Sequence, residues 1–215
     1  MVKFRIACHV CTWGELTRVH TAPVFRQISE AGYEGVEGLW FDSAEDLVEI
    51  VSEARTWGLH MVSAHARTPG QVIRYNAALG NKVCEVWEGP MEDLGSPGIA
   101  HEERFPLAAK YFKPFIAEAD RYKMRLHHHI HLGQLVVTME HVELLVRHMP
   151  DMGILLDTGH LAAAGGDAVE ILHKYGDRVA HVHLKDFYRG DNWNLENMDF
   201  IKSFVLPGMD LPLAF

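Results

Sequence analysis

Short apolar segments alternate with longer segments of helical periodicity along most of this 215-residue chain. The strand-like segments lie near residues 4–10, 35–40, 60–64, 82–87, 124–129, 153–156 and 179–183. Strands joined by long helical connections cannot pair as hairpins, because each crossover returns the chain to start the next strand in the same direction. The alternation therefore predicts a parallel sheet, and with this many repeats a parallel (β/α) barrel.

The connecting segments carry helix signals. Between residues 22 and 31, Val24, Phe25 and Ile28 recur at helical spacing. A second helix is expected from Ser43, which forms a capping pair with Asp46, to about Trp57, where Gly58 ends it. By the same criteria, further helices are expected around residues 72–79, in a long segment that ends near residue 122, and at residues 139–147 and 168–174.

The last part of the chain breaks this pattern. After Asp186 the sequence is loop-like and contains Pro207, Gly208 and Pro212. We therefore expect one domain over residues 1–215, an α/β barrel of the TIM type that lacks the eighth strand and helix. The exposed strand edges of such a barrel favour association, so we expect a homodimer.

Composition excludes several classes of partner. Hydrophobic residues make up 48% of the chain, enough for one sizeable core, and the net charge of -9 disfavours nucleic acid as a partner. The sequence has no long apolar segment for a membrane, and three cysteines do not form a disulfide framework. These features predict a cytoplasmic protein.

Polar side chains gather where the expected strands end, the place at which (β/α) barrels carry their functional groups. In chain order they are His9, Trp13, Glu37, His65, Glu88, His129, His131, Asp157, His160, His183 and Lys185. Taken singly, each is explained as well by a buried, hydrogen-bonded histidine or a carboxylate that caps the next helix. Together they indicate a site.

The pattern within these strands points to a metal ion. Two-residue alternation places His127, His129 and His131 on one face of a strand, and does the same for His181, His183 and Lys185. Asp157 ends an apolar run, where an uncompensated carboxylate would cost several kcal/mol. Two imidazoles and a carboxylate suit Zn, Mn, Fe or Co better than Ca. The expected cofactor is a divalent ion, one of these four or Mg.

Several segments also resemble a known family. Leu155-Leu156-Asp157-Thr158-Gly159-His160-Leu161 with Gly165-Gly166-Asp167, Arg178-Val179-Ala180-His181-Val182-His183-Leu184-Lys185-Asp186 and Gly32-Tyr33-Glu34-Gly35-Val36-Glu37 resemble the xylose isomerase-like sugar phosphate isomerase/epimerase superfamily. Within it, His129-Ile130-His131-Leu132-Gly133 resembles the inosose dehydratase branch, whereas epimerases usually have glutamate in place of His129.

The resemblance implies a divalent metal ion held by His129, Asp157 and His183, with a last ligand, normally a glutamate on the eighth strand, missing. It implies that His160 contacts substrate oxygens, and Lys185 is a second candidate for moving a proton. The expected activity is metal-assisted isomerisation, epimerisation or dehydration of a sugar, a keto-polyol or a sugar phosphate.

The remaining polar residues at strand ends have less specific roles. We expect Trp13, His65, Glu88 and His131 to bind substrate, and Glu37, His65 and Glu88 are reserve bases. A partner subunit or a tail acid could supply the missing ligand, the acids being Glu196, Asp199 and Asp210.

Two other functions compete. One is a catalytically weakened relative that binds metal or carbohydrate without turnover. The other is phosphodiester cleavage at abasic DNA, which the acidic charge balance disfavours.

Overall fold

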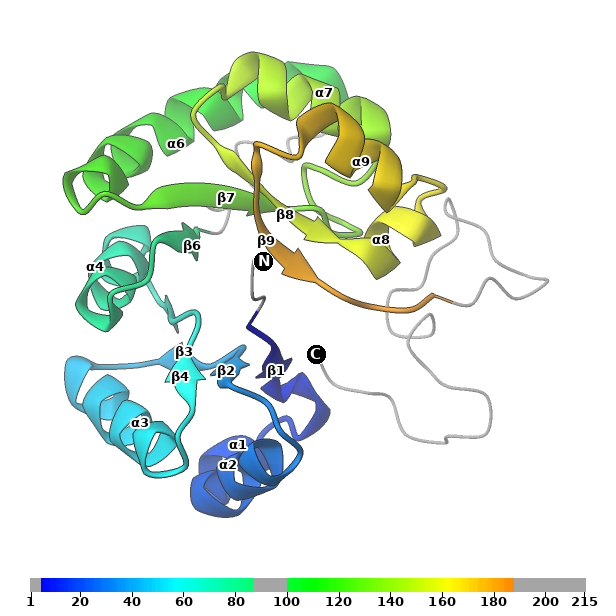
Figure 1. Ribbon diagram of the computed structural model, residues 1–215. Helices are drawn as coiled ribbons and strands as arrows, with labels where there is room; N and C mark the ends of the chain where they lie inside the picture. The colour runs from blue at the N-terminus through cyan, green and yellow to red at the C-terminus, as the bar shows by residue number, and fades with distance from the viewer. Residues whose placement is uncertain (1–4, 87–99, 188–215) are drawn as a thin grey trace. The chain divides into compact units, whose positions relative to one another are not determined.

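The computed structural model describes residues 5–86 and 100–187 (Figure 1). The chain divides into two compact units, the first ending at Asn81 and the second beginning at Lys82. We refer to residues 5–81 as the amino-terminal unit and to residues 82–86 and 100–187 as the carboxyl-terminal unit. The expectation of one domain over the whole chain stays a prediction.

The amino-terminal unit repeats strand and helix. In chain order it contains β1 (Ala7–His9), η1 (Val10–Thr12), α1 (Leu16–Val19), α2 (Thr21–Glu30), β2 (Gly35–Glu37), β3 (Trp40–Phe41), α3 (Ala44–Thr56), β4 (His60–Met61), β5 (His65–Ala66) and α4 (Pro69–Leu79). Strands β1, β2 and β4 pair in that order, β3 pairs with β5, and all three pairings are parallel.

Local sequence explains most of these boundaries. The side chain of Ser43 accepts a hydrogen bond from the backbone N–H of Asp46 at the start of α3, and Gly58 follows its end with φ +71°. The segment expected as one strand at 35–40 is interrupted at Gly38, which has φ +87°. A Cβ there would lie 2.3 Å from the ring of His9, so only glycine fits.

The carboxyl-terminal unit holds a four-stranded parallel sheet in the order β6-β7-β8-β9. Its elements are β6 (Val83–Glu85), η2 (His101–Glu103), α6 (Arg104–Arg121), β7 (Arg125–His129), α7 (Met139–His148), β8 (Gly153–Asp157), α8 (Thr158–Ala163), α9 (Ala168–Tyr175) and β9 (Val179–His183). Figure 1 shows β7 and β8 side by side, with α6 and α7 packed together along them.

Burial in this unit is greatest along β8, in which every residue from Gly153 to Asp157 is buried. A parallel strand covered on both faces reads as a continuous apolar run, and Ile154, Leu155 and Leu156 fit that rule. Phe105 and Leu145 on the helices are also fully buried. The carboxylate of Asp157 is thus held at the end of the most buried strand of the sheet.

The predicted elements agree with the observed ones. All seven expected strands are present, although two continue after a break as the short strands β3 and β5. The expected helices are found at α2, α3, α4, α6, α7 and α9, whereas α1 and α8 were not predicted. The described residues after β9, 184–187, contain no helix or strand. The expected absence of an eighth strand concerns residues beyond 187, which lie outside the described part.

No helix in the described ranges is long and apolar enough to cross a membrane.

Candidate metal centre

The last residues of the four parallel strands β6, β7, β8 and β9 are, in order, Glu85, His129, Asp157 and His183. In register, Asp157 lies opposite His183, while Leu155, two residues earlier, lies opposite His129. Residues two apart on a strand share a face, so these three strand ends present their side chains on one face of the sheet. Glu85 joins them by the same rule, since it lies opposite His127.

Three of these side chains bring their donor atoms together. Oδ2 of Asp157 lies 3.3 Å from Nε2 of His129 and 3.5 Å from Nδ1 of His183. One ligand atom from each residue lies within 4.8 Å of the other two. The side chains are 7%, 0% and 12% exposed for His129, Asp157 and His183, so the cluster is shielded from water.

The two oxygens of Asp157 have different partners. Oδ1 accepts a hydrogen bond of 2.9 Å from the backbone N–H of His160 and so caps α8. Oδ2 faces the cluster and also lies 2.9 Å from Nζ of Lys185. Burial would raise the pKa of Asp157, but the hydrogen bonds from His129 and His183 and the nearby His160 and Lys185 outweigh it and hold the pKa well below its usual range. Asp157 is therefore an anion.

His129 lies between two carboxylates. Its Nε2 faces Asp157, and its Nδ1 lies 3.2 Å from Oε1 of Glu85. Burial alone would lower the pKa of His129, but the interactions with Asp157 and Glu85 raise it above its usual value. Sequence reasoning missed Glu85. The available signal was a single acid inside the apolar run Val83-Cys84-Glu85-Val86.

His160 and Lys185 lie next to this cluster. Nζ of Lys185 is 3.2 Å from Nε2 of His160, and the rings of His160 and His131 have centroids 3.7 Å apart. Burial, the largest cause in both, lowers the pKa of His131 to about 4 and that of His160 to about 2. Both imidazoles are therefore neutral near pH 7, and His131 donates from Nδ1 to the carbonyl oxygen of Leu132 at 2.8 Å.

The donor set fits a divalent transition-metal ion. His129, Asp157 and His183 offer two imidazole nitrogens and one buried anionic oxygen, which suit Zn, Mn, Co or Fe. The ion pair with Lys185 does not conflict with this, because a carboxylate oxygen has two lone pairs and can serve both partners.

The remaining predicted site residues lie outside the described carboxyl-terminal unit. Trp13 and His65 lie in the amino-terminal unit, where Nε1 of Trp13 is 3.4 Å from Oε1 of Gln27 and the ring of His65 stacks on Trp40. Glu88 lies outside the described residues. Of the predicted substrate-binding residues, the carboxyl-terminal unit therefore places only His131, among its described residues, beside the cluster.

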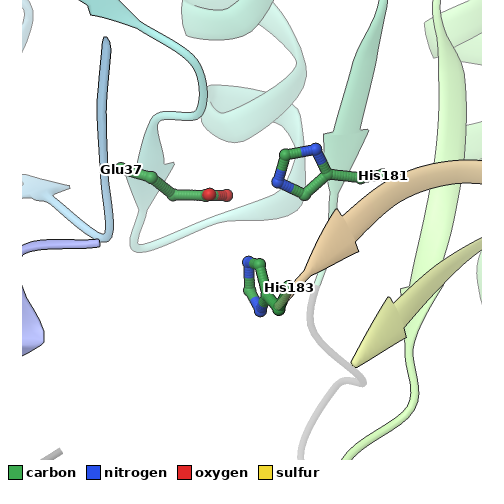
Figure 2. A group of neighbouring side chains, drawn as sticks. All are labelled: Glu37, His181 and His183. Atoms are coloured by element: carbon green, nitrogen blue, oxygen red, sulfur yellow. The ribbon is translucent and has the colours of Figure 1, made fainter. Parts of the chain in front are cut away.

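Further histidines line the same face of the sheet. Figure 2 shows His181 and His183 on strand β9. Their ring centroids are 5.3 Å apart. The ring of His181 in turn stacks on that of His127. Glu37, also labelled in Figure 2, is the buried last residue of β2 and is described with the amino-terminal unit.

Comparison with known proteins places the chain in a family. The family model described as "xylose isomerase-like TIM barrel" matches residues 25–210. This chain belongs to that family. The fold class predicted from the sequence, a parallel (β/α) barrel of the TIM type, is thereby confirmed.

Curated relatives with similar sequences are inosose dehydratases. The one from Clostridium perfringens is 37% identical over 148 residues, which cover 61% of this chain and 50% of the relative. The one from Geobacillus kaustophilus is 43% identical over 91 residues, covering 40% and 29%. The chain thus spans about half the length of the curated relatives it matches, and the resemblance to the inosose dehydratase branch is confirmed.

Solved structures share the fold at low sequence identity. A sugar phosphate isomerase/epimerase from Parabacteroides distasonis superposes with a TM-score of 0.67 and 15% identity, covering 93% of this chain and 80% of that one. The probable 3-DHS dehydratase from Bacillus anthracis gives 0.66 and 16%, covering 88% and 76%. These likenesses support the architecture.

Proposed function

We propose that this protein is a divalent-metal-dependent dehydratase that removes water from a keto-polyol of the inosose type. The observation that carries the proposal is the donor cluster of His129, Asp157 and His183 beside the Lys185–His160 pair. The cluster is placed to hold an ion, and the pair is placed to move a proton next to it.

His129, Asp157 and His183 would hold the ion. When bound, a divalent ion polarises a substrate carbonyl or hydroxyl oxygen and so acidifies the neighbouring C–H bond. The protein contributes a buried, preorganised set of donors, with Oδ1 of Asp157 fixed by the start of α8 and Oδ2 turned to the cluster. A carboxylate held in this way does not have to reorganise when charge develops on the substrate.

Lys185 and His160 would carry the proton. Their nitrogens are 3.2 Å apart, within the reach needed for direct transfer. Nε2 of the neutral His160 would take the proton from the carbon beside the carbonyl, the C–H electrons form a carbon–carbon double bond, and the C–O bond of the next carbon breaks. The Lys185 ammonium would give a proton to the departing hydroxyl, which leaves as water, and transfer of the proton from His160 to Lys185 would restore both residues.

The relatives support the choice of substrate class. The curated proteins with similar sequences are inosose dehydratases, which favours dehydration over isomerisation, although both begin with the same proton removal. The net charge of -9 disfavours a nucleic-acid substrate. His131, whose neutral ring lies against His160, is a candidate contact for a substrate hydroxyl.

The test is turnover of inosose by chelator-stripped protein reloaded separately with Mn, Co, Zn, Fe or Mg. We expect a product whose mass is lower by one water in at least one reloaded sample and none in the stripped one. Running the reaction in deuterium oxide separates the alternatives, because isomerisation introduces deuterium without loss of water. Protein that binds no metal, or that binds it and leaves inosose and related keto-sugars unchanged, contradicts the proposal.

A further inference from the structure

Glu85 is a buried acid that none of the steps above uses. It ends β6, its side chain is 8% exposed, and it lies opposite His127 in the register of the sheet. A buried carboxylate is costly unless its charge is compensated, so a compensating partner is expected next to Glu85. Its Oε1 lies 3.2 Å from Nδ1 of His129, the residue two further along β7 on the same face.

The two nitrogens of His129 thus face different carboxylates. Nε2 lies 3.3 Å from Oδ2 of Asp157, inside the donor cluster, whereas Nδ1 is turned to Glu85. Among the described residues, Glu85 does not belong to the group whose donor atoms lie within 4.8 Å of one another. It therefore reaches the cluster through the ring of His129.

We propose that Glu85 is a positioning residue of the metal centre, which keeps the proton of His129 on Nδ1 and the ring turned so that Nε2 faces the ion. The inference rests on the proposed metal-dependent function. A neutral imidazole carries its proton on either nitrogen, and only the nitrogen without it can bind a metal. An acceptor fixed at Nδ1 selects the tautomer and the ring orientation together.

The geometry makes this role specific to Glu85. His131 and His160 also lie near His129, but their rings contact its ring at centroid distances of 5.0 and 6.1 Å and offer no anion to Nδ1. Strand pairing fixes the position of Glu85, since β6 and β7 are adjacent in the sheet. The carboxylate and the ring that it orients are thus held by neighbouring strands.

The first measurement uses the full wild-type chain loaded with zinc. Long-range proton–nitrogen correlation spectra distinguish a protonated Nδ1 from a metal-bound Nε2, and the signals of His129 are identified by their loss in His129→Asn. We expect His129 with its proton on Nδ1 and Nε2 bound. The opposite tautomer overturns the inference while leaving metal binding itself intact.

The second measurement is zinc affinity, determined by competition with a chromophoric chelator. We expect Glu85→Ala to bind one zinc ion about 10- to 100-fold more weakly than wild type, and Glu85→Gln, which keeps an acceptor, to lose less. Glu143→Gln is the matched control, since it removes a carboxylate that pairs with Lys174 on the helices, and its affinity should be unchanged. Circular dichroism confirms that each variant is folded.

The outcomes separate this inference from the proposed function. If wild type binds no zinc and His129→Ala behaves identically, the metal centre itself is wrong. If wild type binds and Glu85→Ala binds equally well, only the role of Glu85 is wrong. Complete loss of binding in both Glu85 variants also overturns it, because Glu85 would then be a ligand. If Glu85→Ala does not fold, Glu85→Gln and the wild-type spectrum still decide.

Discussion

The carboxylate of Asp157 accepts a hydrogen bond from the backbone N–H of His160 through Oδ1, at 2.9 Å, while Oδ2 is turned to the donor cluster. One residue therefore ends strand β8, caps helix α8 and supplies the anion of the proposed centre. The cap fixes the carboxylate, and the helix that it starts carries His160 close to Lys185. The two proposed functions of the site, ion binding and proton transfer, are linked through this bond.

Substitutions of Asp157 should separate its role as the cap of helix α8 from its role as the anion that binds the metal ion. Asp157→Asn keeps an oxygen for the cap but removes the charge, so we expect metal affinity to fall at least 100-fold. Asp157→Ala should lose that affinity and also about 1 kcal/mol of cap stability relative to Asp157→Asn. Chelator competition gives the affinity, and urea unfolding of the stripped proteins gives the stability.

Asp167→Asn provides the comparison for Asp157. Asp167 caps α9 through a 2.8 Å hydrogen bond from the backbone N–H of Val169 and lies outside the donor cluster. Its variant should change stability slightly and affinity not at all. Equal affinity in wild type and Asp157→Asn would show that the anion does not bind the ion.

Replacement of Lys185 should slow turnover strongly and leave the affinity for the metal ion nearly unchanged. Because Nζ of Lys185 contacts both Oδ2 of Asp157 and Nε2 of His160, Lys185→Met should lower the dehydration rate about 100- to 10,000-fold. Metal affinity should stay within a few-fold of wild type. Steady-state kinetics on inosose and zinc competition are the two measurements.

The variant Lys185→Arg distinguishes an electrostatic role of Lys185 from a role in proton transfer. Arginine keeps a positive charge beside Asp157 but does not give up its proton near neutral pH. We expect it to be as slow as Lys185→Met. An arginine variant that retains the wild-type rate would assign Lys185 an electrostatic role.

The substitution Gly159→Ala should disturb the pair formed by Lys185 and His160. A Cβ built at Gly159 would lie 2.7 Å from Cβ of Lys185, so the segment after β9 that carries the lysine must shift. A displacement of about 1 Å at a reacting group costs about 100-fold in rate, and we expect a loss of that order in Gly159→Ala.

Gly70→Ala is the corresponding control in α4. The nearest atoms to a Cβ at Gly70 belong to the guanidinium of Arg74, which can move aside, and alanine favours the helix by up to about 1 kcal/mol. The rate should be unchanged, and the unfolding midpoint should rise slightly. Comparable loss of activity in both variants would mean that the effect at Gly159 is not local.

His141, which lies outside the proposed metal centre, should make the stability of the protein depend on pH. Its Nδ1 accepts from the backbone N–H groups of Val137 and Thr138 at the start of α7, and its ring stacks on that of His101 with centroids 3.9 Å apart. Burial, followed by the neighbouring His101, lowers the pKa of His141 to about 4. A proton on Nδ1 would remove the acceptor from both bonds.

Because folding lowers the pKa of His141, the protein should lose stability as the pH falls. The unfolded chain takes up the proton first, near pH 6.5, so the contribution of His141 is complete above that pH and is lost as the pH falls toward 4. His141→Gln keeps an acceptor that does not titrate in this range. We expect its thermal midpoint to match wild type at pH 7.5 and to exceed it by about 2–4 °C at pH 4.5. Parallel midpoints across the range would contradict this.

Local sequence patterns determined where the strands and several caps lie. The two-residue alternation around His129 and His183 placed their side chains on the same face of their strands, because that spacing is a property of any extended chain. Ser43 marked the start of α3 for a similar reason, since its hydroxyl acts on a backbone N–H only three residues away.

Tertiary structure decided which side chains meet. The contact between Glu85 and His129 depends on how β6 and β7 are shifted along each other, and that between Lys185 and Asp157 depends on the pairing of β8 with β9. Strand register is set by packing between segments far apart in the chain, and periodicity within one strand carries no information about it. The sequence alone therefore nominated His129, Asp157 and His183 as ligands, and His160 and Lys185 for proton transfer. Only the fold brought Glu85 to the cluster and Lys185 to Asp157.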